Sequence, residues 1–288
     1  MMELIAFGLV WGVTVSFLAL ALGTTWRILG ILDFGLAGVY AVVAYALYTF
    51  HVELGMPIWL AVPLSVAVGP VLQVAIYAIA YRPFLIQRRP LATLVLISLA
   101  VLYICENALS LIYTSSGRMV LTSVPMRLEV ASVSLTIIDI ANVAVLMVIV
   151  IGLQLMFRFS DLGLSLRATA TNPELARIFA VSPERVRITV LGLAGGLTSI
   201  SSVLLSLYEP ITPSGGFNPL LFAFAAIVVA STKSGIGIGA HVLAGLGLGL
   251  LAGISLIVIP SQWQLAVPFA AMLVFSLVRR SVSTQRTV

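Results

Sequence analysis

The sequence has little charge of either sign. Only 9% of its 288 residues are Asp, Glu, Lys or Arg, whereas about 25% is usual in a soluble domain. So few charged side chains cannot cover a water-facing surface, which excludes ordinary soluble proteins and disordered chains. A single cysteine, Cys105, excludes a scaffold of intrachain disulfides. His51 and His241 have no partners at ligand spacing, so we expect no metal site.

Long apolar runs are present instead, and hydrophobic residues make up 61% of the chain. A membrane helix needs about 20 apolar residues, and most of the runs have this length. The sequence therefore predicts an all-α polytopic membrane protein with about nine transmembrane segments. These lie at residues 4–23, 28–50, 57–80, 91–113, 134–157, 187–208, 219–232, 235–259 and 263–278. The segment 219–232 is short for a full crossing, which predicts a broken or tilted helix.

The loops between these segments differ in their arginine content. Arginines are concentrated in loops 81–90 and 158–187 and in the C-terminal tail, whereas loops 51–56 and 209–218 have none. Basic residues gather in cytoplasmic loops of membrane proteins, so we expect the N-terminus outside and the C-terminus in the cytoplasm. The same rule explains the net charge of +5, and no nucleic-acid partner is expected. No linker is visible, so residues 1–288 are expected to form a single transmembrane domain.

Glycines recur at intervals of one helical turn in two of the predicted segments. Gly245, Gly249 and Gly253 share one helix face, as do Gly192 and Gly196. Small residues at this spacing let helix backbones approach closely in a membrane. The pattern predicts two tightly packed helix faces.

The 158–187 loop is the longest polar stretch and contains two helix starts. Asn172 and Ser182 are each followed by proline and glutamate, which is typical of a capped helix N-terminus. A short amphipathic helix is therefore predicted at 173–180. Its apolar residues are Leu175, Ile178 and Phe179. Two interpretations stay open: the helix docks on another protein, or it lies on anionic lipid.

Several motifs in this chain occur together in one known family. The loop contains Gly163-x3-Arg167-Ala168-x3-Asn172-Pro173-x2-Ala176, Tyr81-Arg82-Pro83 follows the third segment, and Leu32-Asp33-Phe34 lies early in the second. In order and spacing these resemble the permease subunits of ABC importers of the branched-chain amino acid type. The length resembles the shorter of the two permeases in such systems.

The resemblance implies an ABC importer permease fold, with residues 158–187 as the ATPase-docking loop. The residues expected at that contact are Arg167, Asn172, Glu174, Arg177, Ile178, Phe179 and Arg185. It also implies two ABC ATPase subunits, a second permease in a heterodimer, an extracytoplasmic substrate-binding protein and the lipid of a bacterial cytoplasmic (inner) membrane. The chain has no GxxxxGK[ST] motif, so ATP and Mg are expected on the ATPase partners. This chain is expected to bind no cofactor and to be no enzyme.

Polar residues within apolar segments are candidates for the translocation pathway. We expect this role for Asp33, Phe34, Glu106, Asn107 and Gly235. For Asp33, a structural ion pair and a carboxylate that reaches the membrane interface stay open as alternatives. For Glu106 and Asn107, the alternative is a structural role in holding helices together. The expected solute is a branched-chain or related amino acid. The family's early histidine is replaced in this chain, so urea, short amides, nucleosides and sugars are alternatives.

Two other classes of protein were compared with this pattern. An ion-coupled secondary transporter is the second alternative, but it often shows inverted repeats and paired acids, and neither is visible. An intramembrane enzyme needs a nucleophile with a base, or a metal cluster, and the sequence shows no such group. The resemblance therefore favours the permease.

Overall fold

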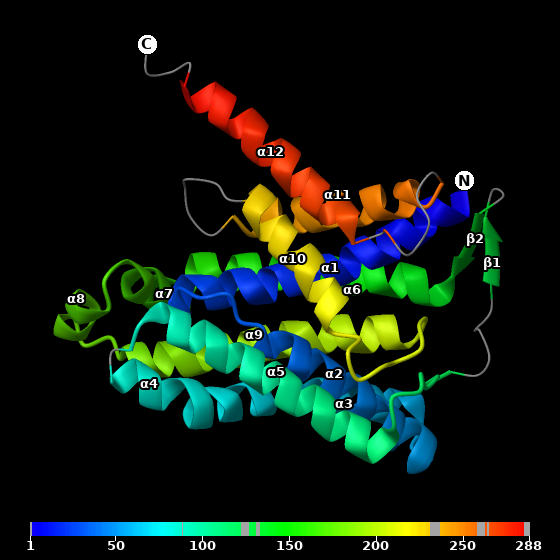
Figure 1. Ribbon diagram of the computed structural model, residues 1–288, viewed down its shortest axis with the longest axis horizontal. Coiled ribbons are helices and arrows are strands. Elements are labelled where there is room, and N and C mark those ends of the chain that lie inside the picture. Colours follow the sequence, from blue (N-terminus) through cyan, green and yellow to red (C-terminus); the bar gives the residue numbers. More distant parts are fainter. Residues whose placement is uncertain are drawn as a thin grey trace.

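The computed structural model of the protein describes residues 2–87, 89–121, 127–130, 133–230, 237–257, 263 and 265–284. The helices and strands run in the order α1 (Met2–Leu29), α2 (Gly35–Tyr48), η1 (Thr49–Glu53), α3 (Ile58–Ile76), η2 (Tyr77–Tyr81), α4 (Arg82–Ile86), α5 (Leu91–Tyr113), β1 (Arg127–Val130), β2 (Val133–Thr136), α6 (Ile137–Phe159), α7 (Asp161–Thr171), α8 (Pro173–Ile178), α9 (Pro183–Ser206), α10 (Phe217–Ala230), α11 (Ile238–Ser255) and α12 (Ala266–Thr284). Both η elements are π-helical turns that continue a neighbouring α-helix. The fold is a helical bundle in which most of the long helices run along one common axis, whereas α12 runs obliquely to it (Figure 1).

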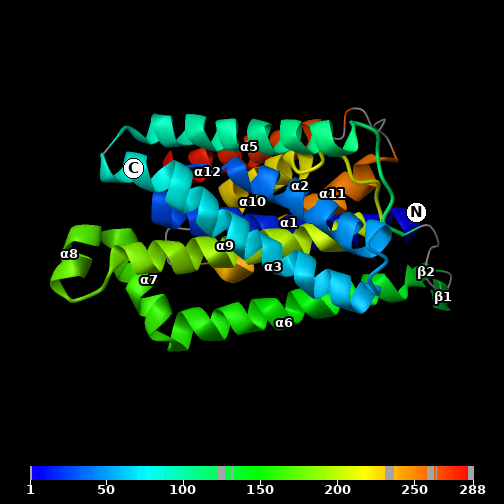
Figure 2. The same ribbon diagram turned by 90° about the horizontal axis from the view of Figure 1, so that it is seen from below.

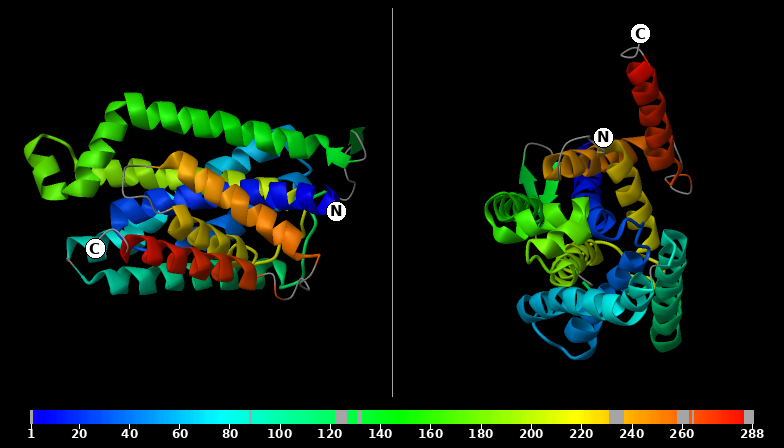
Figure 3. Two further views of the ribbon diagram at one scale, coloured as in Figure 1. Left: turned by 90° about the horizontal axis from the view of Figure 1, so that it is seen from above. Right: turned by 90° about the vertical axis from the view of Figure 1, so that its left-hand side faces the viewer.

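Seven of the described helices are long and apolar enough to cross a membrane. The expected multi-pass helical fold is therefore confirmed. The predicted short segment is also confirmed, because α10 has only 14 residues and would span roughly 20 Å at about 1.5 Å per residue. The helix α12 contacts α10 and α11 but stands away from the rest of the bundle (Figure 3).

Helix α1 lies at the centre of the bundle, where it packs against α11, α9 and α10. The predicted end at residue 23 was wrong, because the helix continues to Leu29. It stops at Gly30, whose φ of +73° is a left-handed conformation that commonly ends helices. Asp33 consequently lies in the connection before α2, where the sequence had predicted a position inside the second segment.

The glycine face on α11 makes the expected close contact, and its partner is α1. A Cβ atom on Gly249 would overlap the backbone of Gly12, and one on Gly245 would lie 2.7 Å from the Cα of Ser16. On α9 the prediction was wrong by one position: Gly192 and Gly196 make ordinary contacts. Gly195 instead makes that helix's close approach, to the backbone of α3.

The loops separate to the two ends of the bundle as their arginine content predicts. At one end, Arg82 of the 81–90 loop pairs with Glu184 of the 158–187 loop. At the other end, Arg118 and Ile211 form a backbone bridge between the 114–133 and 209–218 loops. The start of α1 and the end of α12 also lie at opposite ends (Figure 2), which agrees with an odd number of crossings.

Two local elements were not predicted. Strands β1 and β2 form an antiparallel hairpin in which Arg127 pairs with Thr136, so the fifth segment starts at Ile137 rather than at 134. The arginine-rich loop also contains a complete additional helix, α7, before the predicted short one.

Candidate functional site

The arm, defined as residues 161–181, projects from the end of the bundle that also holds α4 (Figure 1). It begins with a sharp bend between α6 and α7. The Ser160 hydroxyl accepts a hydrogen bond from the Gly163 N–H at 3.4 Å and caps α7. Any Cβ on Gly163 would overlap the Phe157 carbonyl, so this bend requires glycine. The bend therefore fixes the direction in which α7 leaves the bundle.

Both predicted helix caps in the arginine-rich loop are present. The Asn172 side chain accepts hydrogen bonds from the N–H groups of Glu174 and Leu175 at 3.0 and 3.1 Å. The Ser182 hydroxyl accepts one from Arg185 at 3.5 Å, at the start of α9. Capping side chains of this kind satisfy N–H groups that have no partner within the helix. Helix α8 is thus well defined although it has only six residues.

The apolar residues of α8 are exposed. Ile178 and Phe179 each expose 77% of their surface and Leu175 exposes 52%, whereas Ala176 is buried against the rest of the chain. Phe179 follows the last residue of α8, and Ala180 turns the chain back with a φ of +60°. The arm therefore holds two large apolar side chains at its tip in a fixed geometry.

Charged residues surround this tip. Glu174 and Arg177 are exposed on α8, and Arg185 is exposed in the first turn of α9. Arg167, which the resemblance also placed at the docking contact, lies on α7 and lines a cavity with residues of α6. Within the predicted set, Arg167 is therefore set apart from the tip.

The arm packs on the bundle through α7, which contacts α6, α9 and α1. An ion pair lies beside this junction, at the start of α9. The Arg82 guanidinium lies 2.6 Å from the Glu184 carboxylate, and this joins the start of α4 to the first turn of α9. Exposed ion pairs stabilise a fold only modestly. The Arg82–Glu184 pair matters here because it places the Tyr-Arg-Pro motif beside the arginine-rich loop.

The Asp33 carboxylate is completely buried and has three hydrogen-bond donors. It accepts hydrogen bonds from the Tyr81 hydroxyl, from the Gln73 amide at 2.8 Å and from the Gly35 N–H at 2.9 Å. These donors belong to η2, α3 and the start of α2. The carboxylate thus joins three elements. The alternative of a structural ion pair is wrong, because its partners are neutral donors.

The structure does not bring the other predicted pathway residues to Asp33 as one cluster. Phe34 is adjacent and donates its N–H to Ser98 at 3.2 Å. Glu106 is half-buried on α5, and the exposed Asn107 donates its amide to the Tyr103 carbonyl of the same helix at 2.7 Å. Gly235 lies outside the described residues.

Gln73 is a contact residue that the sequence reasoning missed. Gln73 lies within the apolar segment 57–80, which also contains the polar residue Ser65. Both side chains are fully buried. A buried amide in a membrane segment requires a partner, so its polarity was an available signal. Tyr81 was noted as part of a motif, but nothing in the sequence links it to Asp33, 48 positions away.

Comparisons with known proteins agree with this architecture. The family described as branched-chain amino acid transport system / permease component matches residues 4–276. The high-affinity branched-chain amino acid transport system permease protein LivH of Escherichia coli K12 is 25% identical over 94% of this chain and 91% of its own. The xylose transport system permease protein XylH of the same organism is 29% identical, over 46% of this chain and 35% of its own.

One solved structure shares the fold. It is described as PsaBC from Streptococcus pneumoniae in complex with Fab. The match has a TM-score of 0.52 and 12% sequence identity, and it covers 93% of this chain and 89% of that chain. The shared fold therefore extends over most of the chain.

Proposed function

Because the chain belongs to the family of branched-chain amino acid transport system permease components, we propose that it is the translocation subunit of an ATP-driven importer. Its solute is a branched-chain or related amino acid. The observation that supports the substrate most directly is the similarity to LivH along 94% of the chain. ATP and Mg bind to separate ATPase subunits, and this chain performs no hydrolysis.

The arm is the site where an ATPase docks. Phe179 and Ile178 are large, apolar and exposed at the tip, and water is an unfavourable environment for such a pair. A groove on the ATPase covers them, while Arg177 and Arg185 face acidic residues at its edge. Burial of an aromatic anchor at the centre of an interface commonly contributes about 2 kcal/mol or more.

Movement of the ATPase reaches the bundle through α9. This helix begins beside the arm, carries the Glu184–Arg82 pair in its first turn, and packs along α1, α2 and α3. A partner shifts a conformational equilibrium only through contacts that differ between the two states. A short capped helix with a fixed bend transmits such a contact better than a flexible loop.

The complete importer contains two ATPase subunits, this permease paired with a second permease, and an extracytoplasmic substrate-binding protein. It lies in a bacterial cytoplasmic membrane, with the arm and C-terminus in the cytoplasm and the N-terminus outside. The arginine distribution supports this orientation, because the loops richest in arginine all lie at the arm end of the bundle. Asp33 and Phe34 are the residues we place nearest the pathway.

Cysteine labelling tests the orientation. In a Cys105→Ser background, Thr171→Cys and Ser214→Cys place single thiols at exposed positions on opposite ends of the bundle. An impermeant maleimide applied to intact cells is expected to label the position 214 variant only. Labelling of both positions, or of position 171 alone, would contradict the proposed orientation.

Uptake measurements test the substrate. The chain is co-expressed with its proposed ATPase, permease and binding-protein partners, and uptake of radiolabelled leucine is measured in competition with isoleucine, valine, urea and xylose. We expect competition by the branched-chain amino acids alone. Competition by xylose alone would favour a sugar permease, an alternative supported by the partial match to XylH.

A further inference from the structure

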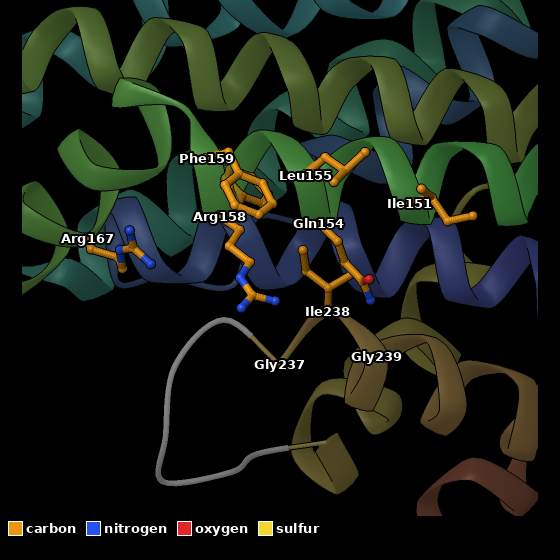
Figure 4. Close-up of a pocket in the computed structure, with 10 residues that line it drawn as sticks. Ile151, Gln154, Leu155, Arg158, Phe159, Arg167, Gly237, Ile238 and Gly239 are labelled. Carbon is orange, nitrogen blue, oxygen red and sulfur yellow. The ribbon is translucent and has the colours of Figure 1, made fainter.

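A cavity of about 440 Å³ lies beside the bend between α6 and α7, outside the tip of the arm and away from Asp33. Its walls come from the last turns of α6, from Arg167 on α7 and from the segment Gly237–Gly239 at the start of α11 (Figure 4). The cavity is therefore at the arm end of the bundle, where the transmembrane helices terminate.

Two arginines and one amide direct polar groups into this cavity. Gln154 and Arg158 are one helical turn apart on α6 and extend toward Ile238, while Arg167 approaches from the side (Figure 4). Within the part of the chain that the structure describes, neither arginine forms an ion pair with a carboxylate. Guanidinium groups bind phosphate through paired charge-assisted hydrogen bonds, so this pair matches a phosphate group.

The bend holds the two arginines in a fixed relation. Arg158 precedes it and Arg167 follows it, and the capping Ser160 and the tightly packed Gly163 define its geometry. The Arg158 guanidinium also lies 5.5 Å from the centre of the Phe159 ring, which favours a defined position. The two arginine side chains therefore need little further ordering when an anion enters the cavity.

An apolar row leads from the cavity along the outer face of α6. Ile151, Leu155 and Phe159 line the cavity and are exposed, and Val148 continues the row on the same helix. A soluble anion would contact the arginines alone and leave this row uncovered. A phospholipid covers both, because its phosphate meets the arginines while its acyl chains lie along α6. Basic pockets between transmembrane helices on the cytoplasmic side bind anionic headgroups in this manner.

We infer that this cavity binds the phosphate of an anionic phospholipid, with Arg158, Arg167 and Gln154 as its headgroup ligands and α6 as the surface for its acyl chains. The bound lipid bridges α6, α7 and the start of α11. It thereby stabilises the bend that aims the arm.

Native mass spectrometry of the purified, delipidated full chain tests this inference. Short-chain phosphatidylglycerol and phosphatidylcholine are titrated separately, and bound lipid is counted for wild type, Arg158→Gln and Arg89→Gln. Arg89 is an exposed arginine that follows α4 at the same end of the bundle and lies outside the cavity, so it controls for general charge. We expect wild type and Arg89→Gln to prefer phosphatidylglycerol, and Arg158→Gln to bind it about fivefold more weakly.

Three outcomes would overturn the inference. Equal phosphatidylglycerol binding by wild type and Arg158→Gln would show that Arg158 is not a headgroup ligand. Displacement of the lipid by millimolar inorganic phosphate would assign the cavity to a free anion. Crosslinking of a Gln154→Cys variant to the second permease would show that a protein covers it. An unchanged melting temperature of Arg158→Gln shows that the variant is folded, since Arg158 is exposed.

Discussion

The bundle around α1 and the arm formed by α7 and α8 differ in the burial of their apolar side chains. In the bundle, apolar residues of α1 such as Val15 and Phe17 are completely buried, and glycines bring α1 and α11 into backbone contact. In the arm, the largest apolar residues, Ile178 and Phe179, are among the more exposed of the chain. Different contacts define the two regions: close backbone packing in the bundle, and helix caps with a tightly packed bend in the arm. The core around α1 is closed to solvent, whereas the tip of the arm has the properties of half an interface.

The largest expected effect is on the packing of the bundle. A Cβ on Gly249 would overlap Gly12, so Gly249→Ala should force α1 and α11 apart and destabilise the protein by about 3 kcal/mol. The matched control is Gly247→Ala on the same helix, where a Cβ meets no atom within 4 Å. Thermal unfolding in detergent should show a lower melting temperature for Gly249→Ala only. Equal melting temperatures for the two variants would show that the α1–α11 contact is not close.

The second effect should leave the bundle unchanged and weaken docking alone. Phe179→Ala should reduce ATPase binding by about 2 kcal/mol, with an unchanged melting temperature because Phe179 is 77% exposed. Co-purification of the ATPase and substrate-stimulated ATP hydrolysis in reconstituted membranes measure this. Arg177→Ala should have a smaller effect, since charges at an interface edge mainly change the association rate.

Leu111→Ala is the control for that prediction, because it truncates an apolar side chain that is 86% exposed on α5, away from the arm. It should bind ATPase like wild type. If Phe179→Ala also matches wild type in both assays, the tip of the arm contacts lipid rather than an ATPase.

A third, smaller effect concerns the junction at Asp33. Tyr81→Phe removes one of three hydrogen bonds to the carboxylate and should cost about 1 kcal/mol of stability. Tyr103→Phe, at a side chain that is 60% exposed, is the control. Melting temperatures measure both variants, and a drop shared by the two would point to a general effect of losing a hydroxyl.

Asp33→Asn separates the two roles considered for this residue. If the carboxylate lines the pathway, the variant should alter leucine uptake while the complex still assembles. If it only joins α2, α3 and η2, the variant should lower the melting temperature together with Tyr81→Phe, and the combined loss should be less than additive. Normal uptake and normal stability would exclude both roles.

The smallest expected effect lies at the end of the bundle opposite the arm. Burial raises the pKa of the Glu209 carboxyl above its ordinary value of 4.5. Folding therefore favours the protonated form, and its stabilising contribution is lost as pH rises through the raised pKa. As the pH rises above 4.5, the melting temperature of wild type should therefore fall slightly more than that of Glu209→Gln. Parallel pH profiles for the two proteins would show that Glu209 is not buried.

Local signals in the sequence predicted much of both regions. Asn172 and Ser182 cap their helices as their residue types indicate, because a cap depends on neighbours in the chain. The glycine face of α11 was visible for the same reason. The docking and pathway roles stay predictions, since the structure gives positions for these residues and not their partners.

Long-range pairs were beyond such reasoning. The partners of Asp33 come from positions 73 and 81, and no periodicity within one segment specifies them. The cavity beside Arg158 could not be predicted for the same reason. The arginines of the loop indicated only which side of the membrane it faces. The bend that places Arg158 and Arg167 at one cavity depends on backbone packing at Gly163. The shift from Gly196 to Gly195 shows the remaining error, since spacing identifies a helix face but not the residue nearest its neighbour.

The placement of the chain ends has a consequence for protein engineering. Helix α1 begins at one end of the bundle, and α12 ends at the other (Figure 2). Two permease domains joined directly as one polypeptide would therefore insert in opposite orientations. Under the proposed docking role, only one of the two arms would then face the ATPases. A working single-chain dimer needs an additional membrane-crossing helix as its linker, and a soluble linker of any length should yield an inactive fusion.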